Sequence, residues 1–374
     1  MITEVLRNIF RTNLGVKKTE RVLIFTDRPS KNEKLDFLEA ERRTRLKDIA
    51  YLVSEAGKSF SKEIIFHEYK ATGSHGAEPP EDLWETAFGK RAVTELDKEG
   101  IFKPILSKKA GDSDILKAEK ILARFKKDSV DAVIALSNYS TSHTRFRDLL
   151  TRICNARYAS MPLFEVSMLE GPMNVDWKQL AKTTKLIAGR INKAERIEIE
   201  TANGSRISFS IKGRKAEADT GILTKPGSFG NLPAGEAYLA PLEGTARGKL
   251  VLAWAPTREL KSPVTLIVEE GNVKDILGDE EFADQLRKKL AERKENSNIA
   301  ELGIGTNSMA KRPDNILESE KIMGTIHIAL GDNSSFGGKV KTPFHQDFVF
   351  FRPTVVLIGE NKSRTYLMQN GKFV

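Results

Sequence analysis

Two of the five histidines in this 374-residue chain lie in one short C-terminal segment together with an aspartate. His345 and Asp347 are two residues apart, so a strand would turn both side chains to the same face. His327 precedes them, across the glycine-rich residues 331–338. Two imidazoles and a carboxylate can enclose a divalent ion such as Zn²⁺, Co²⁺, Mn²⁺ or Fe²⁺. On spacing alone, the alternative is a pair of buried histidines that only make hydrogen bonds.

Two glutamates in apolar surroundings extend this set of candidate ligands. Glu236 follows a stretch rich in glycine and proline, and Glu301 lies in the apolar residues 298–307, which end in glycines. A carboxylate inside an apolar strand is unfavourable unless it is paired or bound to a cation. On an edge strand, by contrast, either glutamate would simply point to solvent. Taken with the histidines and the aspartate, the two glutamates complete a coherent set of five ligands.

The other residues with reactive side chains lack such a pattern. Cys154 is the single cysteine, so no internal disulfide can form, and we interpret it as a packing residue. His143 follows a predicted strand at the edge where open α/β sheets bind ligands, but helix capping or a structural hydrogen bond is the favoured explanation. His67 and His75 have no partner pattern. The glycines of residues 331–338 lack the Gly-Lys-Ser/Thr ending of a phosphate loop.

The first half of the chain alternates short apolar runs with amphipathic segments. Strands are expected at residues 22–25, 64–66 and 131–136, and helices at residues 46–53, 115–127 and 144–157. Strands separated by helical crossovers form a parallel sheet with helices on both faces. A helix at residues 177–191 is expected to close this unit. Residues 1–190 are therefore predicted to form a Rossmann-like α/β domain.

The pattern changes at residue 194. Polar and apolar residues alternate at 196–200 and 206–211, and the hairpin signal Asn203-Gly204 lies between these two segments. Further strands are expected at residues 324–330, 347–351 and 354–358, with one helix at residues 280–294. Residues 191–374 are therefore predicted to form an α+β, mainly antiparallel domain that holds the candidate metal ligands.

Composition excludes several classes of protein. Apolar residues make up 40% of the chain and charged residues 30%, which is typical of a globular protein. No apolar run approaches the ~20 residues of a membrane helix, and residues 1–15 lack the features of a signal peptide. The net charge is +9, but the basic residues are dispersed among 51 acidic ones, so nucleic-acid binding is not expected. We expect a cytoplasmic protein without a membrane partner.

Four motifs, in this order along the chain, resemble those of the M29 aminopeptidases, the aminopeptidase T family. They are Asn231-Leu-Pro-x-Gly-Glu236, Glu301-Leu-Gly-x-Gly-Thr-Asn307, Gly324-Thr-x-His327-x-Ala-Leu-Gly331 and His345-x-Asp347. The resemblance covers nearly the whole chain. It implies a homodimer that acts on peptides with a free N-terminus. It also implies two divalent ions, Zn²⁺, Co²⁺ or Mn²⁺, with the ligands Glu236, Glu301, His327, His345 and Asp347.

The resemblance also implies a mechanism. In such a site the metal pair polarises the scissile carbonyl and activates a water molecule, and Glu301 is the candidate bridging ligand or general base. The chain departs from the family at Ser334, with Phe336 close by, where the peptidases carry a tyrosine that stabilises the tetrahedral intermediate. An oxyanion donor of this kind contributes about 10²–10³ in rate.

There are two alternatives to a peptidase. One is a ring-cleaving dioxygenase of the dihydroxypyridine type, with a single Fe²⁺ held by His327, His345 and Asp347 as two histidines and one carboxylate. The other is a non-catalytic metal-binding homologue. Because a mononuclear site has no need of Glu236 and Glu301, their presence favours the metal pair.

Overall fold

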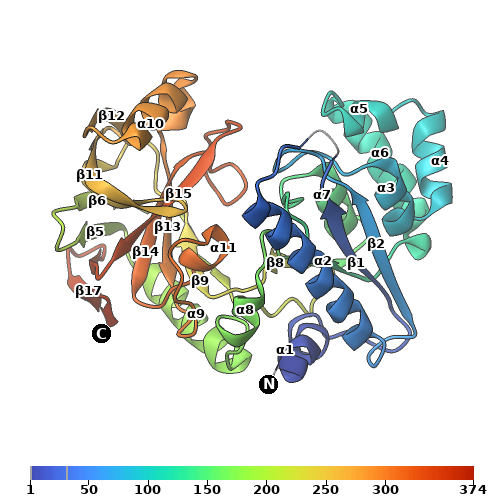
Figure 1. The fold of residues 1–374 in the computed structure, drawn as a ribbon. Helices are drawn as coiled ribbons and strands as arrows, with labels where there is room; N and C mark the ends of the chain where they lie inside the picture. The colour runs from blue at the N-terminus through green and yellow to red at the C-terminus, as the bar shows by residue number, and fades with distance from the viewer. Residues whose placement is uncertain (1, 31–32) are drawn as a thin grey trace. The chain divides into compact units, whose positions relative to one another are not determined.

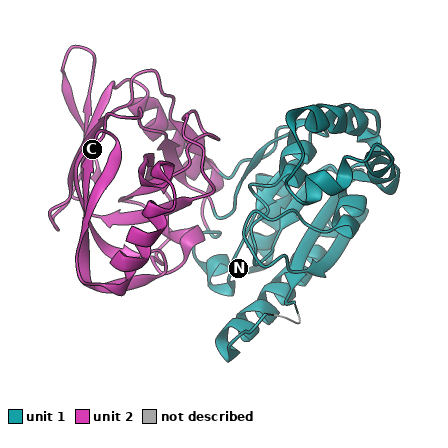
Figure 2. Ribbon diagram, turned by 90° about the horizontal axis from the view of Figure 1, so that it is seen from above, with its two compact units in different colours: residues 1–174, 221–233 teal, residues 175–220, 234–374 magenta. Residues whose placement is uncertain are grey.

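A computed structural model describes residues 2–30 and 33–374 of the chain. It divides into two compact units, coloured separately in Figure 2. Unit 1 comprises residues 1–174 and 221–233, and unit 2 comprises residues 175–220 and 234–374. Within the described residues, no helix is both long and apolar enough to cross a membrane.

Unit 1 is built on a five-stranded sheet in the order β2-β1-β3-β4-β8, in which every neighbouring pair is parallel. Its strands are β1 (Arg21–Arg28), β2 (Glu63–Lys70), β3 (Ala132–Ala135), β4 (Arg157–Ser160) and β8 (Phe229–Asn231). Its helices are α1 (Ile2–Asn8), α2 (Phe37–Gly57), α3 (Glu81–Phe88), α4 (Lys90–Lys98), α5 (Phe102–Leu106), α6 (Asp112–Arg124), α7 (Arg145–Arg152) and α8 (Val166–Glu170), with the short segments η1 (Ile9–Asn13) and η2 (Lys126–Asp128).

Strand β1 is covered on both faces. Leu23 and Phe25 join the hydrophobic core that α3 to α7 complete, while Val22 and Ile24 alternate to the other face and are equally buried. Helix α2 packs against β1 and β2 (Figure 1). Burial on both faces explains why the strand is apolar at every central position rather than at alternate ones.

Unit 2 contains two antiparallel sheets. The eight-stranded sheet has the order β12-β11-β10-β6-β5-β16-β17-β18, and the five-stranded antiparallel sheet has the order β15-β14-β13-β9-β7. The larger sheet contains β5 (Arg196–Glu200), β6 (Arg206–Ser210), β10 (Arg247–Ala255), β11 (Arg258–Glu269), β12 (Asn272–Leu277), β16 (Thr354–Ile358), β17 (Arg364–Gln369) and β18 (Lys372–Phe373). The smaller contains β7 (Glu217–Asp219), β9 (Glu236–Leu239), β13 (Ile299–Gly305), β14 (Thr325–Gly331) and β15 (His345–Phe351).

Apolar side chains from both antiparallel sheets form one core. It includes Leu250 and Leu266 from the larger sheet, and Leu302, Ile328 and Phe348 from the smaller. Helices α9 (Trp177–Ile191) and α10 (Glu281–Ala291) also contribute to this core; the remaining elements of the unit are α11 (Ile316–Ser319) and η3 (Lys294–Ser297). The predicted fold class, a parallel α/β part followed by a mainly antiparallel part, is thus confirmed.

The two units differ in extent from the ranges predicted from the sequence, 1–190 and 191–374. Helix α9 belongs to unit 2, where it packs against β7 and β9. Residues 221–233 return to unit 1, because β8 adds to the edge of the parallel sheet beside β4. A three-residue edge strand has no periodicity of its own, so the sequence carried no sign of this return.

Candidate metal centre

All five predicted ligands lie on one face of the five-stranded antiparallel sheet. On β13, Leu302 and Ile304 point into the core, so Glu301 points to the opposite, outer face. The same alternation applies to β9, β14 and β15, whose apolar residues also enter the core. It brings together on the outer face Glu236, Glu301, His327, His345 and Asp347.

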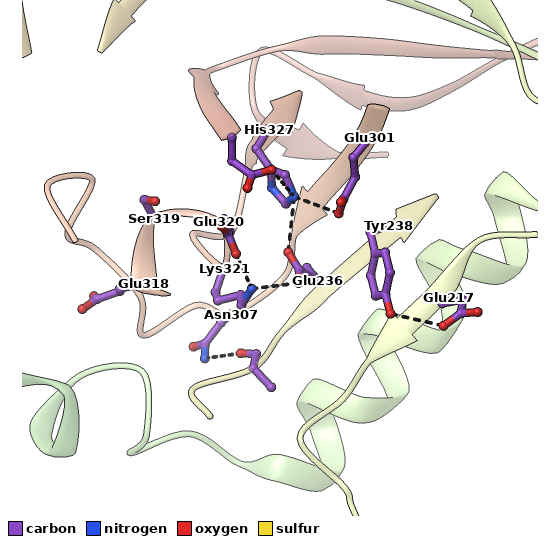
Figure 3. A network of polar contacts seen from close by, with 12 residues as sticks. Glu217, Glu236, Tyr238, Glu301, Asn307, Glu318, Ser319, Glu320, Lys321 and His327 are labelled. Carbon is purple, nitrogen blue, oxygen red and sulfur yellow. Dashed lines mark hydrogen bonds and ion pairs between the residues drawn. The ribbon is translucent and has the colours of Figure 1, made fainter. Parts of the chain in front are cut away.

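Glu301 lies at the centre of this group, between the two histidines. Its Oε1 is 3.4 Å from His327 Nε2, and its Oε2 is 3.4 Å from His345 Nε2. Each histidine has a second carboxylate beside it: Glu236 Oε2 lies 3.4 Å from His327 Nε2, and Asp347 Oδ2 lies 3.6 Å from His345 Nε2. The contacts of His327 with both glutamates are drawn in Figure 3.

The position of His327 depends on a glycine in the neighbouring strand. Gly303 is its partner in the β13–β14 register, and a Cβ at Gly303 would lie 2.0 Å from the imidazole ring. Only glycine leaves room for the ring to extend over β13 towards Glu236. No role for Gly303 was predicted, although its place two residues after Glu301, on the same face of the strand, was a usable signal in the sequence.

Two charged residues that the sequence analysis did not single out complete the cluster. Lys321 is fully buried, and its Nζ lies 2.7 Å from Glu236 Oε1 and 2.7 Å from Glu320 Oε2. Both residues lie in the turn between α11 and β14. Irregular chain has no periodicity that could reveal which side chains turn inwards, so neither residue could be found by pattern.

The negative charges of the carboxylates act on both histidines of the cluster. Burial alone would lower the pKa of His327, but its contact with Glu301 and the charge of Glu236 outweigh burial and raise that pKa to about 9. Burial would also lower the pKa of His345, but the charge of Asp347 and the contact with Glu301 raise that pKa to about 10. Burial and the charge of Glu320 raise the pKa of Asp347. In the absence of a metal ion, the cluster therefore binds protons instead.

The donor atoms fit a divalent cation. Ligand atoms of Glu301, His345 and Asp347 all lie within 4.8 Å of one another. Glu236 Oε2 and Asp347 Oδ1 are buried without a hydrogen-bond partner among the described residues, as expected of oxygens that would contact an ion. His345 Nδ1 lies 2.7 Å from the carbonyl oxygen of Asp332, to which it can donate, which leaves Nε2 free to bind a metal.

Ser334, which stands where the M29 peptidases carry a tyrosine, and Phe336 lie in the loop next to the cluster. Ser334 is exposed, and its hydroxyl donates to the carboxylate of Asp332. The ring of Phe336 is edge-on to His345, with the ring centroids 6.0 Å apart, and is also edge-on to Tyr238. In this arrangement the Ser334 hydroxyl is engaged within its own loop and is not a donor to the ligand cluster.

The candidates of unit 1 lie outside this cluster. Cys154 is buried, and burial raises the pKa of its thiol to about 11, which agrees with a packing role. His67 Nε2 is 3.3 Å from a carboxylate oxygen of Asp82, and His75 Nδ1 accepts a hydrogen bond from a backbone N–H. His143 is exposed, in the loop before α7.

A match to a protein-family model identifies the family of this chain. The model described as NicX, 2,5-dihydroxypyridine 5,6-dioxygenase, matches residues 109–372, well over half of the sequence. The chain belongs to the NicX family. A comparison of this NicX-family chain with curated protein sequences gives no match.

Two solved structures share the fold of this NicX-family protein. The 2,5-dihydroxypyridine dioxygenase from Pseudomonas putida KT2440 is 18% identical with a TM-score of 0.68, and the match covers 100% of this chain and 96% of that one. Wild-type AmpT from Thermus thermophilus is 14% identical with a TM-score of 0.59, and the match covers 100% and 98% of the two chains. The resemblance to M29 aminopeptidases therefore holds for the fold, while the sequence family is the related NicX family.

Proposed function

We propose that this NicX-family protein is a metal-dependent aminopeptidase with a pair of divalent ions, Zn²⁺, Co²⁺ or Mn²⁺. The observation that carries the proposal is Glu301, whose two carboxylate oxygens face two different histidines at equal distances of 3.4 Å. A carboxylate placed in this way suits a ligand shared by two ions. Glu236 and His327 would hold one ion with it, and His345 and Asp347 the other.

The arrangement explains how the protein's own residues would act in hydrolysis. Bound ions would polarise the scissile carbonyl and make the attacking water more acidic. Glu301 would serve either as the ligand shared by the two ions or as the base that accepts a proton from that water. As the peptide C–N bond breaks, Glu301 would return the proton to the leaving amine.

The exposed side of the cluster and its carboxylates fit a substrate with a free amine. The His345 side chain is 30% exposed while that of His327 is 2% exposed, so the cluster is reached from the His345 side. The cluster contains four carboxylates, whose oxygens can accept hydrogen bonds from the N–H groups of a free amine. They are Glu236, Glu301, Glu320 and Asp347. We therefore propose peptides with a free N-terminus as the substrates.

The number of ions per chain tests the pair of metals. Elemental analysis after reconstitution with Zn²⁺, Co²⁺ or Mn²⁺ is expected to give two ions per chain, because the five ligands include three carboxylates that offset most of the charge of two dications. His143→Ala is the matched control, since His143 lies outside the ligand cluster, and should also hold two. A value of one, with iron preferred, would contradict the proposal.

Metal binding is expected to release protons. At pH 7 the metal-free protein should carry protons on His327 and His345, whose pKa values are raised to about 9 and about 10. A metal must displace these protons, so the apparent affinity should rise as pH increases from about 6 to about 9. Calorimetry in buffers of different ionisation enthalpy measures the proton count, and finding no net release at pH 7 would refute this expectation.

The family match favours a second candidate, ring cleavage of a dihydroxypyridine with a single Fe²⁺. The matching family model and one structural relative both carry the name of that dioxygenase. In this case His327, His345 and Asp347 would supply two histidines and one carboxylate. We place it second, because a mononuclear site has no need of both Glu236 and Glu301 as further ligands.

A further inference from the structure

A fully buried lysine lies directly against the candidate metal centre, and the proposed reaction does not use it. The Nζ of Lys321 contacts one oxygen of Glu236 and one oxygen of Glu320, both at 2.7 Å (Figure 3). A buried ammonium group is tolerated only when carboxylates surround it, as they do here. Lys321 is therefore charged, and its charge is a permanent part of the cluster.

The backbone holds Lys321 in this place. Its carbonyl oxygen accepts a hydrogen bond from the backbone N–H of Asn307, and the strand β13 passes close by. A Cβ at Gly305 would lie 2.0 Å from the carbonyl oxygen of Ile322, so the strand and the turn are in contact without a side chain between them. The backbone of Lys321 is therefore fixed beside β13, and its ammonium group is held by the ion pairs with Glu236 and Glu320.

The lysine makes the two halves of the cluster unequal. Glu236 is shared, because Oε1 contacts Lys321 while Oε2 faces His327. Lys321 makes no such contact with Glu301 or Asp347. Among the described residues, these two carboxylates form ion pairs only with the two histidines. Only the carboxylate of Glu236 would thus separate the ammonium group of Lys321 from a dication bound beside Glu236 and His327. A dication beside His345 and Asp347 would have no lysine on the other side of its carboxylate.

We infer that Lys321 sets unequal affinities for the two ions, with the weaker position at Glu236 and His327. This inference rests on the proposed pair of metals. Repulsion between the ammonium group and a dication a few ångströms away, in a site with little water, is large enough to separate the two dissociation constants by about tenfold or more. Glu320 reduces this repulsion, because its carboxylate offsets part of the lysine's charge.

A titration of metal-free protein with Co²⁺, followed by visible absorption and by calorimetry, tests the inference. Wild type should bind two ions in two resolved steps. Lys321→Met removes the charge and should tighten the second step by about tenfold or more, whereas Lys321→Arg keeps the charge and should keep the steps apart. Glu320→Gln, which removes only the offsetting carboxylate, should weaken the second step further.

The outcomes separate this inference from the proposed function. Two ions of equal affinity in wild type would overturn the inference and leave the metal pair intact. A second ion that is lost in Lys321→Met and restored in Lys321→Arg would also overturn it, because the lysine would then serve to position Glu236. If Lys321→Met does not fold, a second step in Glu320→Gln that is unchanged or tighter would overturn it. One ion in wild type would overturn the proposed pair of metals and, with it, the inference.

Discussion

Glu301→Gln is expected to keep the fold and to remove most hydrolysis of unblocked dipeptides and amino-acid anilides, by about 10²–10⁴-fold in kcat. Glutamine is nearly isosteric with glutamate, but it cannot accept a proton and is a weak ligand for a metal. The loss should therefore appear mainly in kcat rather than in KM. Steady-state kinetics with metal-loaded protein measure the effect, and circular dichroism checks the fold.

The control for this variant is Glu269→Gln, the same change at an exposed glutamate on β11 of the eight-stranded sheet. It should match wild type in both kcat and KM. If Glu301→Gln also matched wild type, Glu301 would be neither a shared ligand nor the base, and the proposed mechanism would fail.

Gly303→Ala is expected to displace His327 and to lower activity by about 10²-fold or more. The new Cβ would lie 2.0 Å from the imidazole ring, which is closer than any real contact, so the ring must move. The overpacking should also lower the free energy of unfolding by about 1–3 kcal/mol. Elemental analysis should show loss of the ion beside Glu236 and His327, alongside the kinetic measurement.

Gly189→Ala is the matched control for this substitution. Gly189 lies in helix α9, and a Cβ there would meet no atom within 4 Å. The change should leave activity intact and raise the free energy of unfolding by about 0.5–1 kcal/mol, because alanine favours the helix. Full activity and two bound ions in Gly303→Ala would show that His327 does not need the space that glycine leaves.

Strand periodicity explains why the sequence could indicate that the five candidate ligands share one face of a sheet. His345 and Asp347 alternate with the core residues of β15, and Glu301 alternates with Leu302 in β13. Wherever one face of a sheet is buried, the two-residue period assigns each polar residue to the other face. The predicted parallel sheet rests on a similar signal, the continuous apolar run of β1.

The rest of the site depends on contacts that have no period. Lys321 is buried by a turn that folds against β13, and Gly303 matters because register places it beside His327. Register between strands that are far apart in sequence is a property of the folded sheet, so the contact of Gly303 with His327 could not be assigned in advance, although the position of Gly303 relative to Glu301 was a signal. The same holds for β8, whose three residues join a sheet formed by a distant part of the chain.

Release of free amino acids from a panel of unblocked peptides is the measurement that tests the central claim most directly. The protein loaded with Zn²⁺, Co²⁺ or Mn²⁺ is predicted to cleave members of the panel and to leave their N-acetylated counterparts intact, since it should recognise the free amine. Failure to cleave any unblocked peptide, together with oxygen uptake when the protein is given Fe²⁺ and 2,5-dihydroxypyridine, would contradict the account and assign the site to ring cleavage.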